Sequence, residues 1–284
     1  MTINEALREA RSRLQPVAGT GALDGQRLME HVSGLAKPAL ILRGDEALET
    51  GAGEQFFALV RRRERGEPIA YLIGSVGFYG RTFAVDSRVL VPRPETEHLI
   101  EAVIDDLRGR RKAGGTIVDV GTGSGAIAIT LACELPDLNV FATDVSAEAL
   151  EVARHNAAAN NVFQHVTFLH GDLLAPLRAF GPVDAIVANL PYIPAGAVPP
   201  APNPVSFEPR VALDGGPDGL GLYRRFLREI PAVAAPGASV FLEAAPGTIE
   251  PLAELAQALL PGAYIEIGED YGGLERFVNL SLPG

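Results

Sequence analysis

The sequence contains very little of what disulfide-bonded, metal-binding and membrane-spanning proteins require. The single cysteine, Cys133, excludes both a disulfide within the chain and a cysteine metal cluster. It lies in the apolar run AIAITLACEL, where we expect a buried thiol. The five histidines show no metal-ligand spacing, so we expect no metal; they are His31, His98, His155, His165 and His170.

Long apolar runs are also missing. No stretch approaches the ~20 consecutive apolar residues that a transmembrane helix needs. The first residues, MTINEALREARSRL, lack the basic-then-apolar order of a secretory signal. We therefore expect a cytoplasmic protein that does not associate with membranes.

Negative charge is concentrated in the second part of the chain. Of 24 basic and 35 acidic residues, positions 1–113 hold 17 and 16, which leaves 7 basic and 19 acidic residues for positions 114–284. An acidic field repels a phosphate backbone and attracts a basic protein surface. Free nucleic acid is therefore a poor candidate substrate, although acidic side chains also serve solubility alone.

Hydrophobic periodicity divides the chain. Residues 1–67 predict a small helical domain, because INEALREARSRL, GQRLMEHVSGLA and GEQFFALVRRRERG repeat apolar residues every three or four positions. The run Arg61-Arg62-Arg63 is expected on a solvated helix face. Residues 68–93 contain the short runs AYLIG, RTFAV and RVLVP, which predict β-strands in a hairpin linker.

Residues 94–284 predict an α/β domain in which strands and helices alternate. Expected helices are ETEHLIEAVIDDLRG, GAIAITLACEL, SAEALEVARHNAAAN, GLYRRFLREIPAVA and TIEPLAELAQALL. Expected strands are TIVDV, NVFAT, VTFLH, DAIVA and ASVFLEA, followed by AYIEIGED and RFVNLSL as a terminal hairpin. The alternation predicts a mostly parallel sheet with helices on both faces. The long proline-rich loop from Pro191 to Pro209 is of a length that is often functional.

A glycine-rich turn follows the first of these strands, and it comprises Gly121, Thr122, Gly123, Ser124 and Gly125. Glycine lets the backbone approach a ligand, and the next helix offers free N–H groups. Asp144 ends the next strand, where a carboxylate can accept both ribose hydroxyls, and Asp172 follows the third, where it can accept from an adenine amino group. The spacing favours S-adenosylmethionine but leaves a dinucleotide open, and helix capping remains an alternative for both aspartates.

The tetrapeptide Asn189-Leu190-Pro191-Tyr192 follows the apolar strand DAIVA. An amide or aryl amino nitrogen is a poor nucleophile, because its lone pair is delocalised. The Asn189 side-chain oxygen and the Leu190 carbonyl can each accept one N–H of such a group, while Pro191 fixes the turn and Tyr192 stacks on the plane. The pattern predicts methyl transfer to a planar nitrogen.

Two further segments make a resemblance specific: EPIAYLIGSVGFYGRTFAVDSRVLVPRPETE (67–97) and FEPRVALDGGPDGLGLYRRFL (207–227). With GTGSG and the tetrapeptide, they resemble the protein-(glutamine-N5) methyltransferases that modify class I peptide chain release factors. The resemblance implies a seven-stranded, Rossmann-like class I methyltransferase domain and a helical amino-terminal domain that helps to hold the release factor. It further implies methylation of the glutamine in the Gly-Gly-Gln loop, and we expect a monomer.

The chain departs from the family at two positions. Leu190 stands where the family usually has proline, and Leu173 stands where an aromatic residue often follows the aspartate, which predicts weaker packing on adenine. Arg93, Glu95 and Thr96, with Glu208 and Arg210, are expected to be structural or to border the pocket. Two alternatives stay open: an adenine N6-methyltransferase acting on nucleic acid, and a binding module that has lost turnover.

Overall fold

The computed structural model describes residues 1–109 and 114–284, and the chain falls into two compact units. Unit 1 comprises Met1–Ser75 with Pro199–Glu208, and unit 2 comprises Val76–Val198 with Pro209–Gly284. The proline-rich loop is therefore divided. Its middle part belongs with unit 1, whereas its two ends belong with unit 2.

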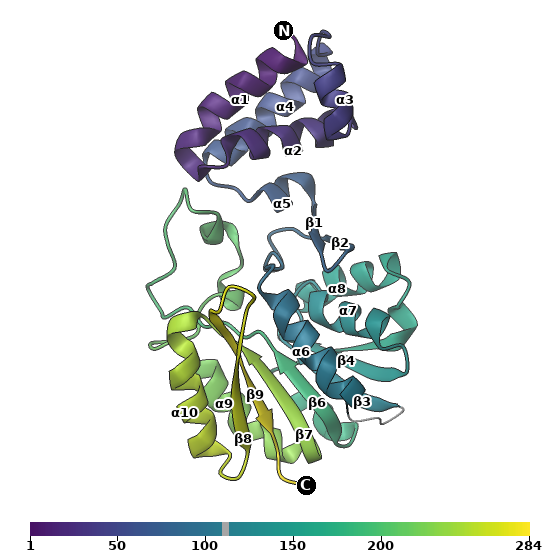
Figure 1. Cartoon of the computed structure of the whole chain (residues 1–284), viewed down its shortest axis with the longest axis vertical. Coiled ribbons are helices and arrows are strands. Elements are labelled where there is room, and N and C mark those ends of the chain that lie inside the picture. Colours follow the sequence, from purple (N-terminus) through teal and green to yellow (C-terminus); the bar gives the residue numbers. More distant parts are fainter. Residues whose placement is uncertain (110–113) are drawn as a thin grey trace. The chain divides into compact units, whose positions relative to one another are not determined.

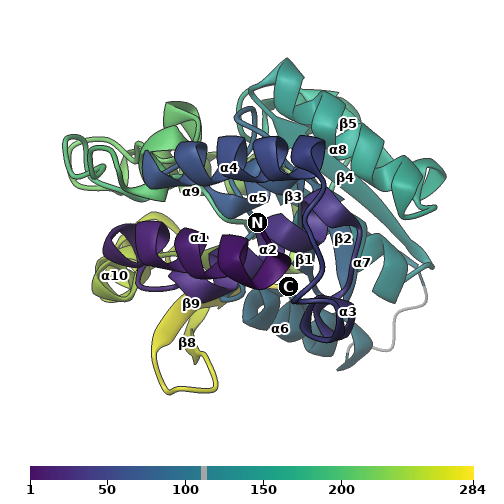
Figure 2. The same ribbon diagram turned by 90° about the horizontal axis from the view of Figure 1, so that it is seen from above.

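Unit 1 is a helical bundle, as the periodicity predicted. It contains α1 (Ile3–Ala18), α2 (Gly21–Ser33), α3 (Lys37–Leu42), α4 (Thr50–Glu64) and α5 (Ile69–Ile73). Figures 1 and 2 show α1, α2 and α4 packed along one another. Their apolar faces meet in a core that includes the fully buried Leu14, Leu28, Met29, Phe56 and Val60. Burial of each such side chain contributes about 1.5–3 kcal/mol.

The prediction for the arginine run was partly wrong. Arg61 is exposed, but Arg63 is buried and donates from Nε to the buried carboxylate of Asp24 at 2.8 Å. Arg62 forms an ion pair with Glu67 at 2.5 Å. A buried charge is costly unless a partner of opposite charge is beside it, so the Arg63–Asp24 pair connects α4 to α2 inside the bundle.

The prediction for residues 68–93 was right for one strand and wrong for two. RTFAV forms β2 (Arg81–Ala84), which pairs with β1 (Ser75–Phe78). AYLIG instead forms α5, which Gly74 ends with a left-handed φ of 82°. Short apolar runs fit either a helix or a strand, and their flanking residues decide. RVLVP forms no strand, since its Pro92 lacks the N–H that a ladder needs.

Unit 2 is built on the predicted mostly parallel sheet of seven strands, in the order β5-β4-β3-β6-β7-β9-β8. The parallel strands are β3 (Gly115–Val120), β4 (Leu138–Asp144), β5 (Val166–His170), β6 (Val183–Ala188) and β7 (Ala234–Glu243). The predicted terminal hairpin is β8 (Tyr264–Glu269) and β9 (Glu275–Ser281), and β9 pairs antiparallel with β7.

Helices cover both faces of this sheet, as Figure 1 shows. On one face lie α6 (Thr96–Gly109), α7 (Ala126–Glu134) and α8 (Ala147–Ala159), and on the other lie α9 (Gly221–Glu229) and α10 (Ile249–Leu259). Burial on both faces explains why the strands read as continuous apolar runs. α9 is shorter than predicted because Pro231 stands in its expected last part. Cys133 of α7 is only partly buried.

The described residues also form six short 3-10 helices: η1 (Phe163–His165), η2 (Ala175–Ala179), η3 (Pro204–Phe207), η4 (Arg210–Ala212), η5 (Ile230–Ala232) and η6 (Pro246–Thr248). The strand register then fixes where chemistry can occur. Val120 of β3 pairs with Thr143 of β4 and with Ala188 of β6. The strands therefore end together, and the segments that follow them meet at one edge of the sheet.

Candidate active site

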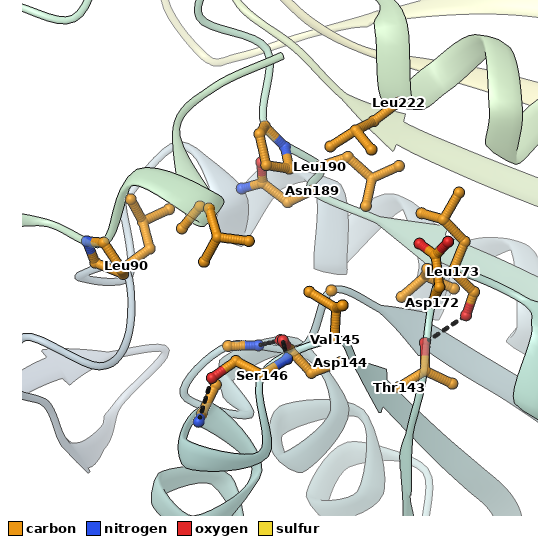
Figure 3. A pocket seen from close by; sticks show the side chains of 18 of the residues that line it. Leu90, Thr143, Asp144, Val145, Ser146, Asp172, Leu173, Asn189, Leu190 and Leu222 are labelled. Atoms are coloured by element: carbon orange, nitrogen blue, oxygen red, sulfur yellow. Dashed lines mark hydrogen bonds between the residues drawn. The ribbon is translucent and has the colours of Figure 1, made fainter. Parts of the chain in front are cut away.

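A cavity of about 280 Å³ lies at the carboxyl edge of the sheet in unit 2 (Figure 3). The ends of β3, β4, β5 and β6 all contribute to its wall. Eight of the predicted site residues line it: Gly121, Gly123, Asp144, Asp172, Leu173, Asn189, Leu190 and Pro191. Thr122, Ser124, Gly125 and Tyr192 are not part of its wall.

The glycine turn needs its glycines for backbone geometry. Gly121, Gly123 and Gly125 all have positive φ, at 74°, 55° and 82°. α7 begins directly after Gly125, and a Cβ on Gly125 would lie only 2.7 Å from the Ile129 Cδ1 of that helix. Thr122 and Ser124 are buried, and the Thr122 hydroxyl donates to Asp119 at 2.6 Å. These two side chains therefore support the turn from behind rather than facing the cavity.

The sequence analysis missed Asp119, which organises this turn from within β3. Its side chain is buried, and its Oδ2 accepts from the Thr122 hydroxyl and from the Ala128 N–H of α7. Burial raises its pKa to about 7, against the effect of those two hydrogen bonds. A buried carboxylate beside three glycines was the available signal, but a strand interior normally predicts packing alone.

Asp119→Asn is expected to change how stability depends on pH. Because the folded-state pKa lies above the unfolded value of 3.8, the folded protein keeps a proton that the unfolded chain releases between pH 4 and 7. The Asp119 contribution to the free energy of unfolding therefore falls as pH rises, by up to about 1.4 kcal/mol per pH unit. Denaturant unfolding at pH 5 and pH 8 should show the variant gaining stability relative to wild type at the higher pH. Asp137→Asn, at an exposed aspartate, serves as control. If the difference in unfolding free energy between Asp119→Asn and wild type were the same at both pH values, the raised pKa of Asp119 would be refuted.

Asp144 is held at the end of β4 by backbone N–H groups. Its Oδ2 accepts from Gly123 at 2.8 Å and its Oδ1 accepts from Ser146 at 2.9 Å. Burial raises its pKa, and these hydrogen bonds partly oppose that rise. Since a carboxylate has about four acceptor positions, two remain for ligand hydroxyls. The Ser146 hydroxyl in turn caps α8 by accepting from Ala149 N. Hydrogen bonds therefore connect the end of β4 to the start of α8.

Asp172 and Leu173 follow β5 on another part of the wall. Asp172 forms an ion pair with Arg225 of α9, and both side chains are about half exposed. Leu173 is buried with a positive φ of 46°, and its carbonyl accepts from the Thr143 hydroxyl at 3.0 Å. Leu173 and Leu222 lie on the same side of the cavity in Figure 3. This side therefore offers an apolar surface with one polar pair at its rim.

Asn189 and Leu190 of the tetrapeptide lie opposite Asp144 in Figure 3. The Asn189 side chain donates from Nδ2 to the Thr96 hydroxyl at 3.3 Å. The Leu190 side chain is buried in the core and would lie 3.2 Å from a Cβ on Gly121. Its carbonyl is 3.3 Å from the Tyr223 hydroxyl, whose closer acceptor is the Glu243 carbonyl. One hydroxyl hydrogen serves mainly the closer acceptor, so the Leu190 carbonyl keeps acceptor capacity.

Tyr192 is partly buried and stays a neutral phenol at ordinary pH. Burial, followed by the nearby Glu243 carboxylate, raises its pKa to about 12. Its backbone packs closely against Gly219, where a Cβ would lie 2.4 Å from the Tyr192 carbonyl oxygen. The tetrapeptide thus combines one cavity-facing amide with a strand-ending turn.

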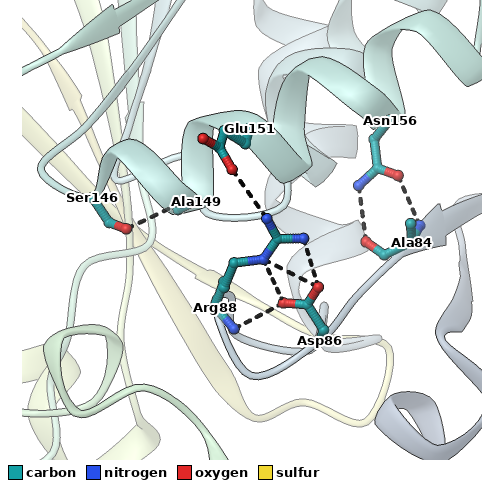
Figure 4. A network of polar contacts seen from close by, with 7 residues as sticks. All are labelled: Ala84, Asp86, Arg88, Ser146, Ala149, Glu151 and Asn156. Carbon is teal, nitrogen blue, oxygen red and sulfur yellow. Dashed lines mark hydrogen bonds and ion pairs between the residues drawn. The ribbon is translucent and has the colours of Figure 1, made fainter.

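Two cavity residues that the sequence analysis missed, Arg88 and Leu90, come from the segment after β2. Figure 4 shows what holds this segment. Arg88 pairs with Asp86 and, at 3.2 Å, with Glu151 of α8. Asn156 of α8 exchanges two hydrogen bonds with the Ala84 backbone and also donates to the Ser124 carbonyl. α8 therefore connects the hairpin to the glycine turn.

Five more of the missed wall residues are Pro209, Val211, Ala212, Leu222 and Arg225. They belong to 207–227, one of the two segments that carry the resemblance, and Arg88 and Leu90 belong to the other. The segments were thus the available signal, but no residue pattern distinguished these positions. Among the described residues, no three potential metal ligands cluster, and no helix has the length and apolar character to cross a bilayer.

Comparison with known proteins finds matches along most of the chain. The family model described as PrmC N-terminal domain matches residues 5–74, and the model described as Methyltransferase small domain matches residues 96–199. A release factor glutamine methyltransferase of Moorella thermoacetica is 42% identical over 282 residues, covering 97% of each chain. The chain belongs to the release factor glutamine methyltransferase family. The family member of Deinococcus radiodurans is 38% identical over 286 residues and covers all of both chains.

Solved structures agree with the fold over about 70% of the chain. A methyltransferase from Pyrococcus furiosus matches with a TM-score of 0.53 and 18% identity, covering 72% of this chain and 91% of its own. A 16S rRNA methyltransferase of T. thermophilus, solved with AdoMet and guanosine, matches with a TM-score of 0.52 and 20% identity, covering 73% and 49%. These matches show that this chain shares the fold of known methyltransferases.

Proposed function

We infer that this chain transfers a methyl group from S-adenosylmethionine to the side-chain amide nitrogen of the glutamine in the Gly-Gly-Gln motif of class I peptide chain release factors. The observation that carries this inference is the placing of Asp144 and Asn189 on opposite sides of one cavity, in a chain of this family. A cofactor site and an amide-acceptor site then face each other.

The residues around Asp144 fit the cofactor. The carboxylate keeps two acceptor positions for a pair of ribose hydroxyls, and Gly121 and Gly123 present bare backbone to the cavity. Leu173, Val145 and Leu222 supply apolar surface for a purine. When bound, S-adenosylmethionine supplies an electrophilic methyl carbon on a positively charged sulfur.

The residues around Asn189 fit a primary amide. The Asn189 Oδ1 and the Leu190 carbonyl can each accept one N–H of the glutamine side chain, which aims its nitrogen and concentrates electron density on it. Bound S-adenosylmethionine would supply the methyl group, and the glutamine nitrogen held by Asn189 and Leu190 would release one proton to water. Tyr192, neutral because of its high pKa, is proposed to pack on the plane of the amide.

The proposal assigns a role to each part of the chain. Residues 1–67 help to hold the release factor, residues 94–284 perform catalysis, and residues 68–93 link these two domains. The acidic balance of positions 114–284 disfavours the alternative, methylation of adenine in nucleic acid. We propose that the enzyme works in the cytoplasm as a monomer, without binding free nucleic acid.

A methyl-transfer assay with radiolabelled S-adenosylmethionine and purified release factor tests the function. Label should appear on the wild-type factor and be lost after Gln→Ala in its Gly-Gly-Gln loop. Mass spectrometry of the tryptic peptide should show one added methyl group on that glutamine. Absence of label on wild-type factor, or equal label on the Gln→Ala factor, would reject the proposal.

A further inference from the structure

Glu243 ends β7, the strand next to β6, and the register places it beside the tetrapeptide. Leu242 of β7 pairs with Ala188 of β6, so the residues that come next, Glu243 and Asn189, are neighbours on adjacent strand ends. The Glu243 side chain is 4% exposed, as is that of Thr96 at the start of α6. An acidic side chain is rarely buried so fully unless hydrogen bonds or charges hold it.

The partners of this carboxylate are the residues that hold the predicted catalytic amide. The Thr96 and Asn189 side chains are close enough to this carboxylate to lower its pKa, and Asn189 donates to the Thr96 hydroxyl at 3.3 Å. The Glu243 Oε2 has no hydrogen-bond partner in the part of the chain that the structure describes. A carboxylate, a hydroxyl and a carboxamide therefore form one buried chain that ends at the cavity.

Such a chain has a direction. An ionised carboxylate only accepts, so the Thr96 hydrogen points to Glu243 and the Thr96 oxygen is left to accept from the Asn189 NH2. The Asn189 Oδ1 then faces the other way, towards the cavity. If Glu243 is protonated, the chain can reverse: Glu243 donates to Thr96, Thr96 donates to the Asn189 oxygen, and the NH2 group faces the cavity.

We propose that Glu243 is a positioning residue, which acts through Thr96 to keep the Asn189 carboxamide turned so that its oxygen, not its NH2 group, faces the substrate. The inference rests on the proposed function, because only an amide substrate requires an acceptor at this position. Reversal would set one NH2 group against another, and the substrate nitrogen would lose the contact that orients it.

The surroundings of Glu243 bring its loss of a proton close to neutral pH. Burial is the main cause that raises its pKa to about 7, and Glu95 adds to the rise while Thr96, Asn189 and Arg276 of β9 oppose it. The Tyr192 and Tyr223 phenols face the same carboxylate and are neutral in this range. Activity should therefore rise as pH increases through about 7, when Glu243 loses its proton.

Glu243→Gln provides the kinetic test, because glutamine keeps the shape but can donate as well as accept. We expect kcat to fall about 10- to 100-fold, with the KM for release factor and the affinity for S-adenosylmethionine nearly unchanged. The rise of kcat near pH 7 should disappear. Thr96→Ala should lower kcat in the same way and Thr96→Ser should restore it, whereas Glu134→Gln, at an ion pair with Arg81, is the matched control.

A second measurement is independent of turnover. In enzyme with 15N-labelled asparagine, the side-chain resonance absent from Asn189→Ala identifies Asn189. Its NH2 shifts should follow pH with a midpoint near 7 in wild type and lose that response in Glu243→Gln. A wild-type enzyme that methylates release factor but whose Asn189 resonance ignores Glu243 would overturn the inference. A responding resonance in a protein that cannot methylate release factor would instead reject the function alone.

Discussion

Replacing Asn189 by alanine is expected to lower kcat by about 10³-fold or more while changing the affinity for S-adenosylmethionine only slightly. The substitution removes the side-chain oxygen that accepts a glutamine N–H, a contact that strengthens as the nitrogen becomes electron-rich. An interaction made mainly in the transition state lowers kcat and kcat/KM together when it is lost. Methyl-transfer kinetics and calorimetry measure the two effects separately.

The structure supplies a control for this substitution. Asn139 is an exposed asparagine of β4, at the opposite end of that strand from Asp144. Asn139→Ala should leave kcat within about twofold, as for a surface change remote from the site. If Asn189→Ala weakened cofactor affinity as strongly as it lowers kcat, Asn189 would belong to the cofactor site, and the proposed acceptor chemistry would be wrong.

Most of the sheet could be predicted because its strands are buried on both faces. Runs such as TIVDV and DAIVA are mostly apolar, and each is followed by a polar or glycine residue. Parallel strands end at one edge, so the sequence brought Gly121, Asp144, Asp172 and Asn189 together before the register was known. The register of β3 with β4 and β6 then accounts for their meeting in the cavity.

The errors occurred where local pattern carries little information. Five residues such as AYLIG satisfy helix and strand alike, and α5 is decided by Pro68 before it and Gly74 after it. Arg63 looked like its exposed neighbour Arg61, because only the packing of α4 against α2 brings Asp24 beside it. The burial of one arginine within such a run can be recognised only when the residue that pairs with it in the folded protein is known.

The polar residues behind the site were missed for a related reason. Asp119 lies inside a strand and Glu243 is the next-to-last residue of ASVFLEA, where a single acid has no distinctive spacing. The importance of Glu243 follows from strand order, which places β7 next to β6 although 45 residues separate Ala188 from Ala234. Residues that face a ligand can be identified from their sequence motifs. Residues that orient them can be identified only when the structure shows which distant part of the chain lies beside them.

Asp144→Ala is expected to have the opposite kinetic signature to Asn189→Ala. Two hydrogen bonds to a carboxylate contribute about 1.5–3 kcal/mol each, so their loss should weaken S-adenosylmethionine binding by at least about 100-fold. The substitution also leaves the Gly123 and Ser146 N–H groups without their acceptor, which loosens the glycine turn. Asp144→Asn should also bind weakly, because its NH2 group would face one of these two backbone N–H groups and cannot accept from it.

Asp172→Ala is the matched comparison, because this second cavity carboxylate is about half exposed and already paired with Arg225. Solvent screens such a pair, so its loss should weaken binding no more than about 10-fold. At saturating cofactor, Asp144→Ala should recover most of the wild-type kcat, since the amide of Asn189 stays in place. Calorimetry that finds equal affinity in Asp144→Ala and wild type would remove the ribose role from Asp144, and the cofactor would have to bind elsewhere along this edge of the sheet.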